Sequence, residues 1–240
     1  MKILIFNLNT FYHLASSTSI MKQYDAKISW VVLKNSYKDI FKFHKKIDRI
    51  YTLEEFILNN NQKYDLIINL DAFINISEFE SLIADKFIGF NFGADEKYRD
   101  VLSGTTKSKK NIFQIYYSIV DKIWKGEGYS IEYHPKKLEE KDASGVFLSD
   151  KKIEKSIKSN LTAKDIQYDN IYFSEEYIIN SINNINRYEN IITDDLDVCS
   201  IANILRKNIY FLDTGLSNCK IEFFGKGKIF KIKRGDTLWL

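Results

Sequence analysis

The runs KISWVVL, at residues 27–33, and DLIINL, at residues 65–70, decide the fold of this chain. Both are short, mostly apolar and rich in isoleucine, valine and leucine, which is typical of strands buried on both faces of a parallel sheet. We expect strands at residues 2–7, 27–33, 47–51, 65–70 and 86–92, with helices at 11–24, 37–43, 53–60, 77–84 and 111–124. Strands that alternate with helices in this way predict βαβ units in a doubly wound domain.

A polar stretch that contains Gly126, Gly128 and the only proline, Pro135, precedes a second alternation of the same kind. Strands are expected there at residues 145–148, 170–173, 190–193 and 208–212, helices at 150–160, 175–185 and 198–206, and alternating runs at 220–224 and 228–233. We therefore predict an N-terminal domain at residues 1–125, a linker at 126–143 and a C-terminal domain at 144–240. The predicted class is α/β, with two Rossmann-like domains facing each other across a cleft where ligands bind.

The composition of the chain argues against several classes of protein and of partner. The chain has 240 residues, 45% of them hydrophobic, and a formal charge of +3, which excludes disorder and argues against nucleic acid as a partner. Its two cysteines, Cys199 and Cys219, are too few for a disulfide framework or a zinc cluster, so we expect a reducing, cytoplasmic setting. We see no signal-peptide core and no run near the ~20 apolar residues of a membrane helix, and therefore expect no transmembrane segment.

The sequence lacks the motifs of several common enzyme reactions. The first expected turn, Asn7 to His13, contains no glycine, and no Walker loop or nucleophile elbow occurs anywhere, so hydride transfer and P-loop chemistry are disfavoured. The three histidines, His13, His44 and His134, show neither the spacing of a metal site nor that of a triad.

Four places along the chain nevertheless carry motifs that form a recognisable pattern when they are taken in order. The first is KILIFNL at 2–8, followed by KISWVVL and by IDRIYTL at 47–53, and the second is YDLIINL at 64–70, followed by FIGF at 87–90. The third is the segment from Asn111 to Pro135, which includes WKGEGY at 124–129 and YHP at 133–135, and the fourth is IITDDLDVCSIA at 191–202. Together these segments resemble glycosyltransferase family 9, the heptosyltransferase-like enzymes of GT-B architecture, in a divergent form with a shortened C-terminal domain. The resemblance implies an inverting transfer of a sugar from a nucleotide-sugar donor to a bacterial glycan or glycolipid acceptor, without a cofactor.

The resemblance also implies roles for particular residues. His13 stands where the family has an aspartate that serves as general base, and a histidine with its ordinary pKa of about 6.5 suits that task, although it is equally well read as a polar residue at a helix start. The acceptor is expected near Asn9, Thr10 and Tyr12. The donor is expected near Asp195, with Asp197 and Ser200 replacing the family's glycine and histidine, and with Lys151 and Lys152 as the nearest cations, which can also be a solvated charged face.

Alternatives remain open. The carboxylates of Asp194, Asp195 and Asp197 can hold Mg²⁺ or Mn²⁺ or can simply cap a helix. The run of lysines from Lys107 to Lys110 can contact an anionic lipid, giving peripheral membrane contact, or form a solvated loop. Because the donor pattern is eroded, the competing function is an inactive relative that acts as a binding or regulatory subunit. A nucleotide-sugar hydrolase or epimerase is a third possibility.

Overall fold

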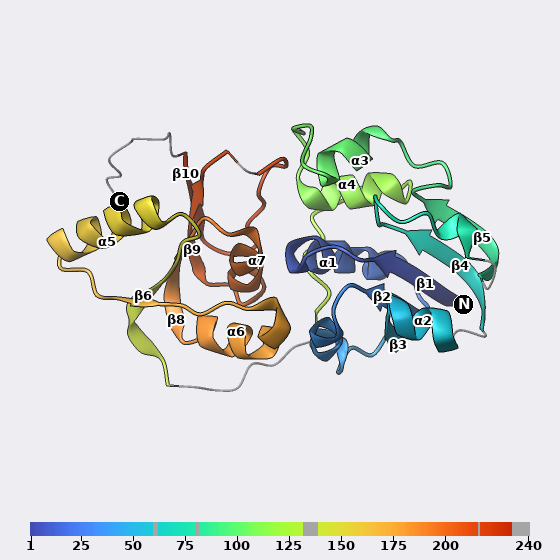
Figure 1. The fold of residues 1–240 in the computed structure, drawn as a ribbon, viewed down its shortest axis with the longest axis horizontal. Coiled ribbons are helices and arrows are strands. Elements are labelled where there is room, and N and C mark those ends of the chain that lie inside the picture. Colours follow the sequence, from blue (N-terminus) through green and yellow to red (C-terminus); the bar gives the residue numbers. More distant parts are fainter. Residues whose placement is uncertain (60–61, 80–81, 132–138, 216, 232–240) are drawn as a thin grey trace. The chain divides into compact units, whose positions relative to one another are not determined.

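The chain forms two α/β units, each with a parallel sheet, which confirms the predicted α/β class (Figure 1). The computed structural model describes residues 1–59, 62–79, 82–131, 139–215 and 217–231. The first unit consists of Met1–Tyr133 with Asn218–Glu222, and the second of His134–Ser217 with Phe223–Leu240. The YHP segment of the expected linker lies outside the described residues. Within the described ranges, the helices are too short or too polar to cross a bilayer.

The first unit contains a parallel sheet of five strands in the order β3-β2-β1-β4-β5. The strands are β1 (Lys2–Asn7), β2 (Lys27–Val32), β3 (Ile47–Thr52), β4 (Lys63–Asn69) and β5 (Ile83–Gly89). The helices are α1 (Phe11–Ser17), α2 (Leu53–Asn59), α3 (Lys97–Leu102) and α4 (Ile112–Ile119), with 3-10 turns η1 (Thr18–Gln23), η2 (Asn35–Phe41) and η3 (Ile76–Glu78). The order reverses between β1 and β4, so their carboxyl ends form the switch point where such sheets bind ligands.

The two central strands form the core because they are apolar on both faces. Leu4 and Phe6 of β1 pack with Phe56 of α2 in one cluster, and the Phe6 and Phe56 rings meet edge to face at 5.1 Å. Ile3 and Ile5, which alternate with them along β1, are equally buried. The alternation of side chains across a strand thus places apolar groups on both sides of β1, as the sequence pattern predicts.

The region around β5 differs from the prediction. A helix at residues 77–84 is wrong, because η3 ends at Glu78 and Ile83 already pairs with Lys63 in the sheet. The expected strand at 86–92 accordingly begins and ends earlier, as β5. The helix α3 was not predicted at all. An edge strand has one solvated side, so β5 carries exposed polar residues whose pattern does not identify a strand.

The second unit repeats the architecture, with five parallel strands in the order β10-β9-β8-β6-β7. The strands are β6 (Lys141–Phe147), β7 (Tyr168–Asn170), β8 (Tyr188–Thr193), β9 (Asn208–Asp213) and β10 (Gly227–Lys231). The helices are α5 (Lys151–Ala163), α6 (Ile178–Ile185) and α7 (Leu196–Ile204), with the turn η4 (Glu175–Tyr177) before α6. Here the order reverses between β6 and β8, so the second switch point lies at the carboxyl ends of these strands.

One segment from late in the sequence packs with the first unit, although it falls within the predicted C-terminal domain. The backbone N–H of Lys220 donates to the carbonyl of Lys110 at 3.1 Å, and that of Ser108 donates to the carbonyl of Asn218 at 2.8 Å. Asn111, which caps α4, also donates from Nδ2 to Glu222 at 3.1 Å. Residues 218–222 therefore add an isolated parallel bridge to the loop before α4 and do not form a strand of the second sheet.

Candidate functional site

His13 lies on α1, directly after the loop that leaves the carboxyl end of β1. Its Nδ1 is 3.1 Å from the hydroxyl oxygen of Tyr116 on α4, and the two rings meet edge to face at 6.3 Å. Burial lowers the pKa of His13 to about 4, because a charged imidazolium is poorly solvated there. The imidazole is therefore neutral at neutral pH and is held by a tyrosine that the sequence analysis did not single out.

A buried polar cluster lies beside this pair, at the switch point between β1 and β4. The Asn7 side chain accepts from Asn9 at its Oδ1, from the backbone N–H at 3.3 Å and from Nδ2 at 2.9 Å. It donates from its own Nδ2 to the hydroxyl of Ser17 at 2.8 Å. The end of β1 and the start of α1 are thereby fixed to each other by side-chain amides.

Asp71 is the carboxylate of this cluster, and it too escaped the sequence analysis. It is 2% exposed and accepts from the backbone N–H of Leu8 at 3.0 Å and from those of Phe73 and Ile74 at 2.8 and 2.9 Å. Both of its oxygens are thus engaged, which makes it a clamp between the loops after β1 and β4. The signal in the sequence is weak: an acidic residue two positions after a buried strand.

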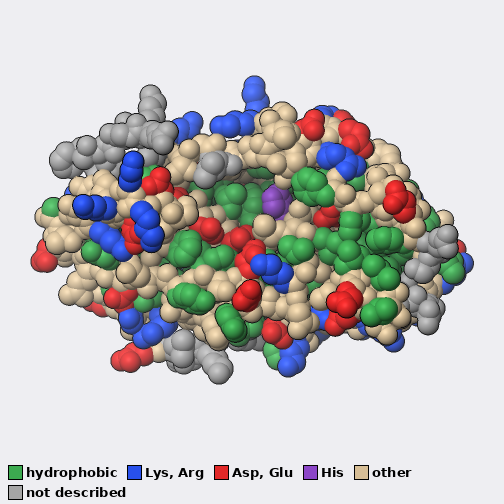
Figure 2. Space-filling view, in the orientation of Figure 1, with side chains coloured by type: hydrophobic (Ala, Val, Ile, Leu, Met, Phe, Trp, Pro, Cys, Tyr) green, Lys and Arg blue, Asp and Glu red, His purple; other side chains and the backbone are tan. Residues whose placement is uncertain are grey.

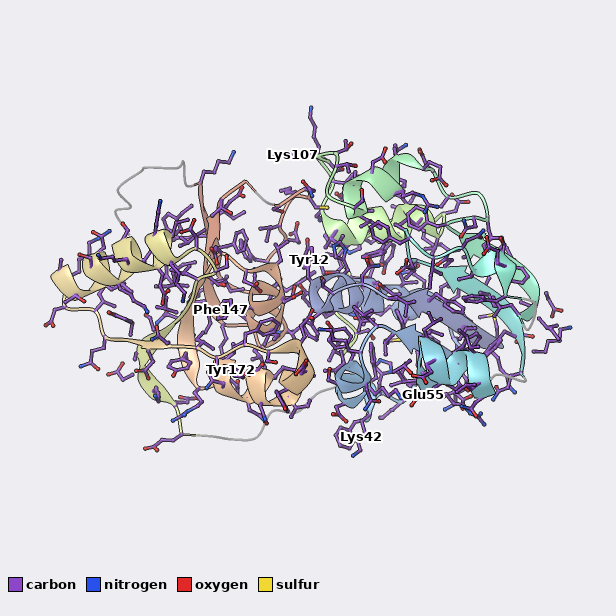
Figure 3. All side chains as sticks on the ribbon, in the orientation of Figure 1. Tyr12, Lys42, Glu55, Lys107, Phe147 and Tyr172 are labelled. Carbon is purple, nitrogen blue, oxygen red and sulfur yellow. The ribbon has the colours of Figure 1, made fainter. Side chains whose placement is uncertain are left out.

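The three predicted acceptor residues have different surroundings. Asn9 is 9% exposed and is committed to Asn7 and to Asp71, at 3.4 Å from its Oδ2. Tyr12, labelled in Figure 3, is also buried, and its ring meets that of His13 at 5.1 Å. Thr10 is exposed and stands at the N-cap position of α1. Of these three side chains, Thr10 is the one most accessible to a ligand.

The predicted donor residues Asp195, Asp197 and Ser200 follow the carboxyl end of β8. Asp195 is the N-cap of α7, where its side chain accepts from the backbone N–H of Val198 at 2.9 Å. Burial raises the pKa of Asp195, with hydrogen bonds from the backbone opposing that shift. Asp197 follows in the first turn and is half-buried, whereas Ser200 is 2% exposed inside α7. The capping interpretation of this acidic run is therefore correct for Asp195.

Asp194 connects the two strands at this switch point. It accepts from the backbone N–H of Ser149 at 2.7 Å and from its hydroxyl at 2.8 Å, and from the backbone N–H of Asp150 at 3.3 Å. Both carboxylate oxygens are engaged by these donors. Among the described residues, no group of three or more His, Cys, Asp or Glu side chains has an arrangement that could hold a metal ion.

The predicted cations occupy the first turn of α5, next to this point. Lys151 and Lys152 are both exposed, and Lys151 forms an ion pair with Glu154 at 2.9 Å. Figure 2 shows basic side chains over α5, a helix that carries four lysines, Lys151, Lys152, Lys155 and Lys158. Lys107, by contrast, belongs to the loop before α4, and its side chain points away from the ribbon (Figure 3).

No protein-family model and no curated protein matches the chain. Solved structures do match. With E. coli heptosyltransferase WaaC bound to ADP-2-deoxy-2-fluoro heptose, the TM-score is 0.64 at 9% identity, over 97% of this chain and 94% of that one. With E. coli ADP-heptose lps heptosyltransferase II it is 0.63 at 8% identity, over 98% and 92%. A family 9 glycosyltransferase from Veillonella parvula gives 0.60 at 11%, over 95% and 85%. The fold is therefore that of the heptosyltransferases.

Proposed function

We propose that this chain, which has the heptosyltransferase fold, is an inverting glycosyltransferase that moves a sugar from a nucleotide-sugar to a bacterial glycan or glycolipid. One observation carries the proposal: similar structures span nearly the whole chain, and two of them were solved with ADP or with an ADP-heptose analogue. Fold similarity alone does not define a reaction, so the residues at the two switch points must supply it. We place the reaction in the cytoplasm, without a metal cofactor.

The first unit would receive the acceptor. In an inverting transfer the acceptor hydroxyl attacks the anomeric carbon of the sugar, the bond from that carbon to the diphosphate breaks, and the hydroxyl proton passes to a base. His13 or a nearby carboxylate would take that proton, and Thr10 would contact the acceptor. Asp71 is unsuited to this role because its oxygens already accept backbone hydrogen bonds.

The second unit would receive the nucleotide-sugar. The backbone N–H groups of the first turns of α5 and α7, together with Lys151 and Lys152, would stabilise the charge that develops on the leaving diphosphate. Asp195 would contribute by holding the start of α7 in place, since its side chain caps that helix. These roles explain why exposed lysines and a capping carboxylate both belong to the predicted site.

A second candidate function has its own observations. Ser200, at the position where the family has a histidine, is buried, and Asp197 adds a carboxylate where the family has a glycine. A carboxylate repels a diphosphate, and a buried serine does not reach one. These residues favour an inactive relative that acts as a binding or regulatory subunit.

Calorimetry and thermal unfolding against ADP-, GDP-, UDP- and CMP-sugars, with and without Mg²⁺, test the proposal. A ligand that binds the folded state at 100 times its Kd adds about 2.7 kcal/mol of stability. We expect one nucleotide to bind selectively. Asp195→Ala, which removes the cap of α7, should weaken that binding, and the control Asp165→Asn, just beyond the end of α5, should leave it unchanged. Binding without transfer to any acceptor would favour the subunit, and no binding at all would refute the donor site.

A further inference from the structure

The hydroxyl proton of Tyr116 determines the state of His13. Tyr116 is fully buried, and its hydroxyl oxygen lies 3.1 Å from Nδ1 of His13. A hydroxyl carries one proton to donate and lone pairs to accept. The interaction can therefore run in two directions, from the hydroxyl to Nδ1 or from an Nδ1–H to the hydroxyl oxygen, and the surroundings decide between them.

Asn7, the neighbouring amide, cannot accept this proton. Its Oδ1 already accepts from the backbone N–H and from Nδ2 of Asn9. Its Nδ2 is a donor, to the hydroxyl of Ser17 at 2.8 Å and to the backbone carbonyl of His13 at 3.4 Å. The proton of Tyr116 therefore needs an acceptor other than Asn7.

The remaining acceptor is Nδ1 of His13. Were Nδ1 protonated, the Tyr116 proton would be buried without an acceptor, at a cost of about 1–3 kcal/mol. The Tyr116 hydroxyl therefore donates to Nδ1. A neutral imidazole that accepts at Nδ1 carries its proton on Nε2, so the network fixes one of the two tautomers of His13.

Nε2 is accessible. No described residue hydrogen-bonds to it, and it is not among the buried polar atoms that lack a partner, so it reaches solvent from a half-buried ring. We propose that His13 is a neutral N–H donor whose Nε2 binds an oxygen of a sugar ligand, and that Tyr116 is the positioning residue that selects this tautomer. The identity of the ligand rests on the proposed function, whereas the tautomer does not.

This assignment changes the reaction that His13 can support. An Nε2 that already carries a proton cannot accept one from an acceptor hydroxyl. His13 would orient a sugar oxygen by hydrogen bonding, and of the two bases named under the proposed function the nearby carboxylate, not His13, would take the hydroxyl proton. In a binding subunit, the same N–H would recognise the sugar without any chemistry.

Imidazole ¹⁵N chemical shifts of the full chain test the tautomer without any ligand. The His13 signals are identified by their loss in His13→Asn. We expect a pyridine-type shift for Nδ1 and a pyrrole-type shift for Nε2 at neutral pH. Tyr116→Phe should abolish this preference, while Tyr117→Phe, which removes a neighbouring hydroxyl bonded to the carbonyl of Ser19, should preserve it. A pyrrole-type Nδ1 in the unmodified chain, or an unchanged spectrum in Tyr116→Phe, would overturn the assignment.

Titration with free hexoses and a heptose then tests the contact. We expect at least one sugar to shift the Nε2 signal and to leave Nδ1 in place. If no sugar moves Nε2, the ligand contact is refuted while the tautomer stands. A chain that fails to bind any nucleotide-sugar still gives both results, so failure of this inference is distinguishable from failure of the proposed function.

Discussion

Asp194 accepts two hydrogen bonds from Ser149, at 2.7 Å from its backbone N–H and 2.8 Å from its hydroxyl. The first unit contains the same device, because Asp71 accepts from the backbone N–H of Leu8 at 3.0 Å. In both units a carboxylate that follows one strand of the switch point ties down the loop that follows the other. The loops that are expected to bind ligands are therefore held by buried side chains.

Removal of the second clamp should destabilise the second unit. Asp194→Ala leaves the backbone N–H groups of Ser149 and Asp150 without their acceptor, and we expect a loss of about 1–3 kcal/mol in the free energy of unfolding. Urea unfolding measures it. Asp213→Ala is the control, because that carboxylate accepts from the backbone N–H of Gly215 at an exposed turn. Equal losses in the two variants would contradict the clamp.

Stability should also depend on pH through His13. Its pKa is near 6.5 in the unfolded chain and about 4 in the folded one, so the unfolded state binds more protons between these values. The stabilisation is complete above pH 6.5 and is lost as the pH falls toward 4, by roughly 2 kcal/mol once the partial exposure of the ring is allowed for. Unfolding at several pH values should show a shallower dependence in His13→Gln; identical slopes would refute the lowered pKa.

Gly89 should not tolerate a side chain. Its φ is +101°, and a Cβ atom there would lie 2.0 Å from the carbonyl oxygen of Asn69. Gly93 has a similar φ of +95° but open space around it. We expect Gly93→Ala to cost about 1–2 kcal/mol for the left-handed backbone, and Gly89→Ala to cost about 2 kcal/mol more for the clash. Thermal unfolding of the pair checks this, and equal midpoints would contradict it.

Exposed lysines on α5 should affect ligand binding and not stability. The double variant Lys151→Ala, Lys152→Ala should leave the free energy of unfolding within about 0.5 kcal/mol, since both side chains are exposed. It should weaken nucleotide-sugar affinity by about tenfold, an effect that added salt reduces. Lys155→Ala, an exposed lysine on the same helix, serves as control. Equal affinities in the double variant and the control would remove these lysines from the donor site.

The pattern of apolar residues in short runs of the sequence identified the strands that are buried on both faces. Residues 27–33 and 65–70 are mostly apolar because successive residues of β2 and β4, which face opposite sides of the sheet, are buried at 30–32 and 66–68, and that requirement is visible in the sequence. The edge strand β5 has no such requirement, so its polar residues gave a false helix at 77–84. A pattern that depends on burial is informative only where burial is complete.

The site was harder to predict because its contacts join distant residues. The hydrogen bond between Asp71 and Leu8 joins residues 63 positions apart, and that between Tyr116 and His13 joins residues 103 positions apart. The sequence around each residue therefore does not indicate its partner. Tyr116 looks like one more aromatic residue of a core helix. The roles predicted for His13, Thr10 and the donor-side lysines stay predictions.

Residues 218–222 have a consequence for any attempt to divide the protein. The chain enters the first unit, leaves it for the second, returns for five residues and leaves again. A single cut in the gene between the two sheets would therefore strip the first unit of its partner for Ser108 and Lys110, and Asn111 of its bond to Glu222. The two units therefore cannot be separated at a single point in the gene. A domain exchanged with a related protein would have to include residues 218–222 together with the rest of the first unit.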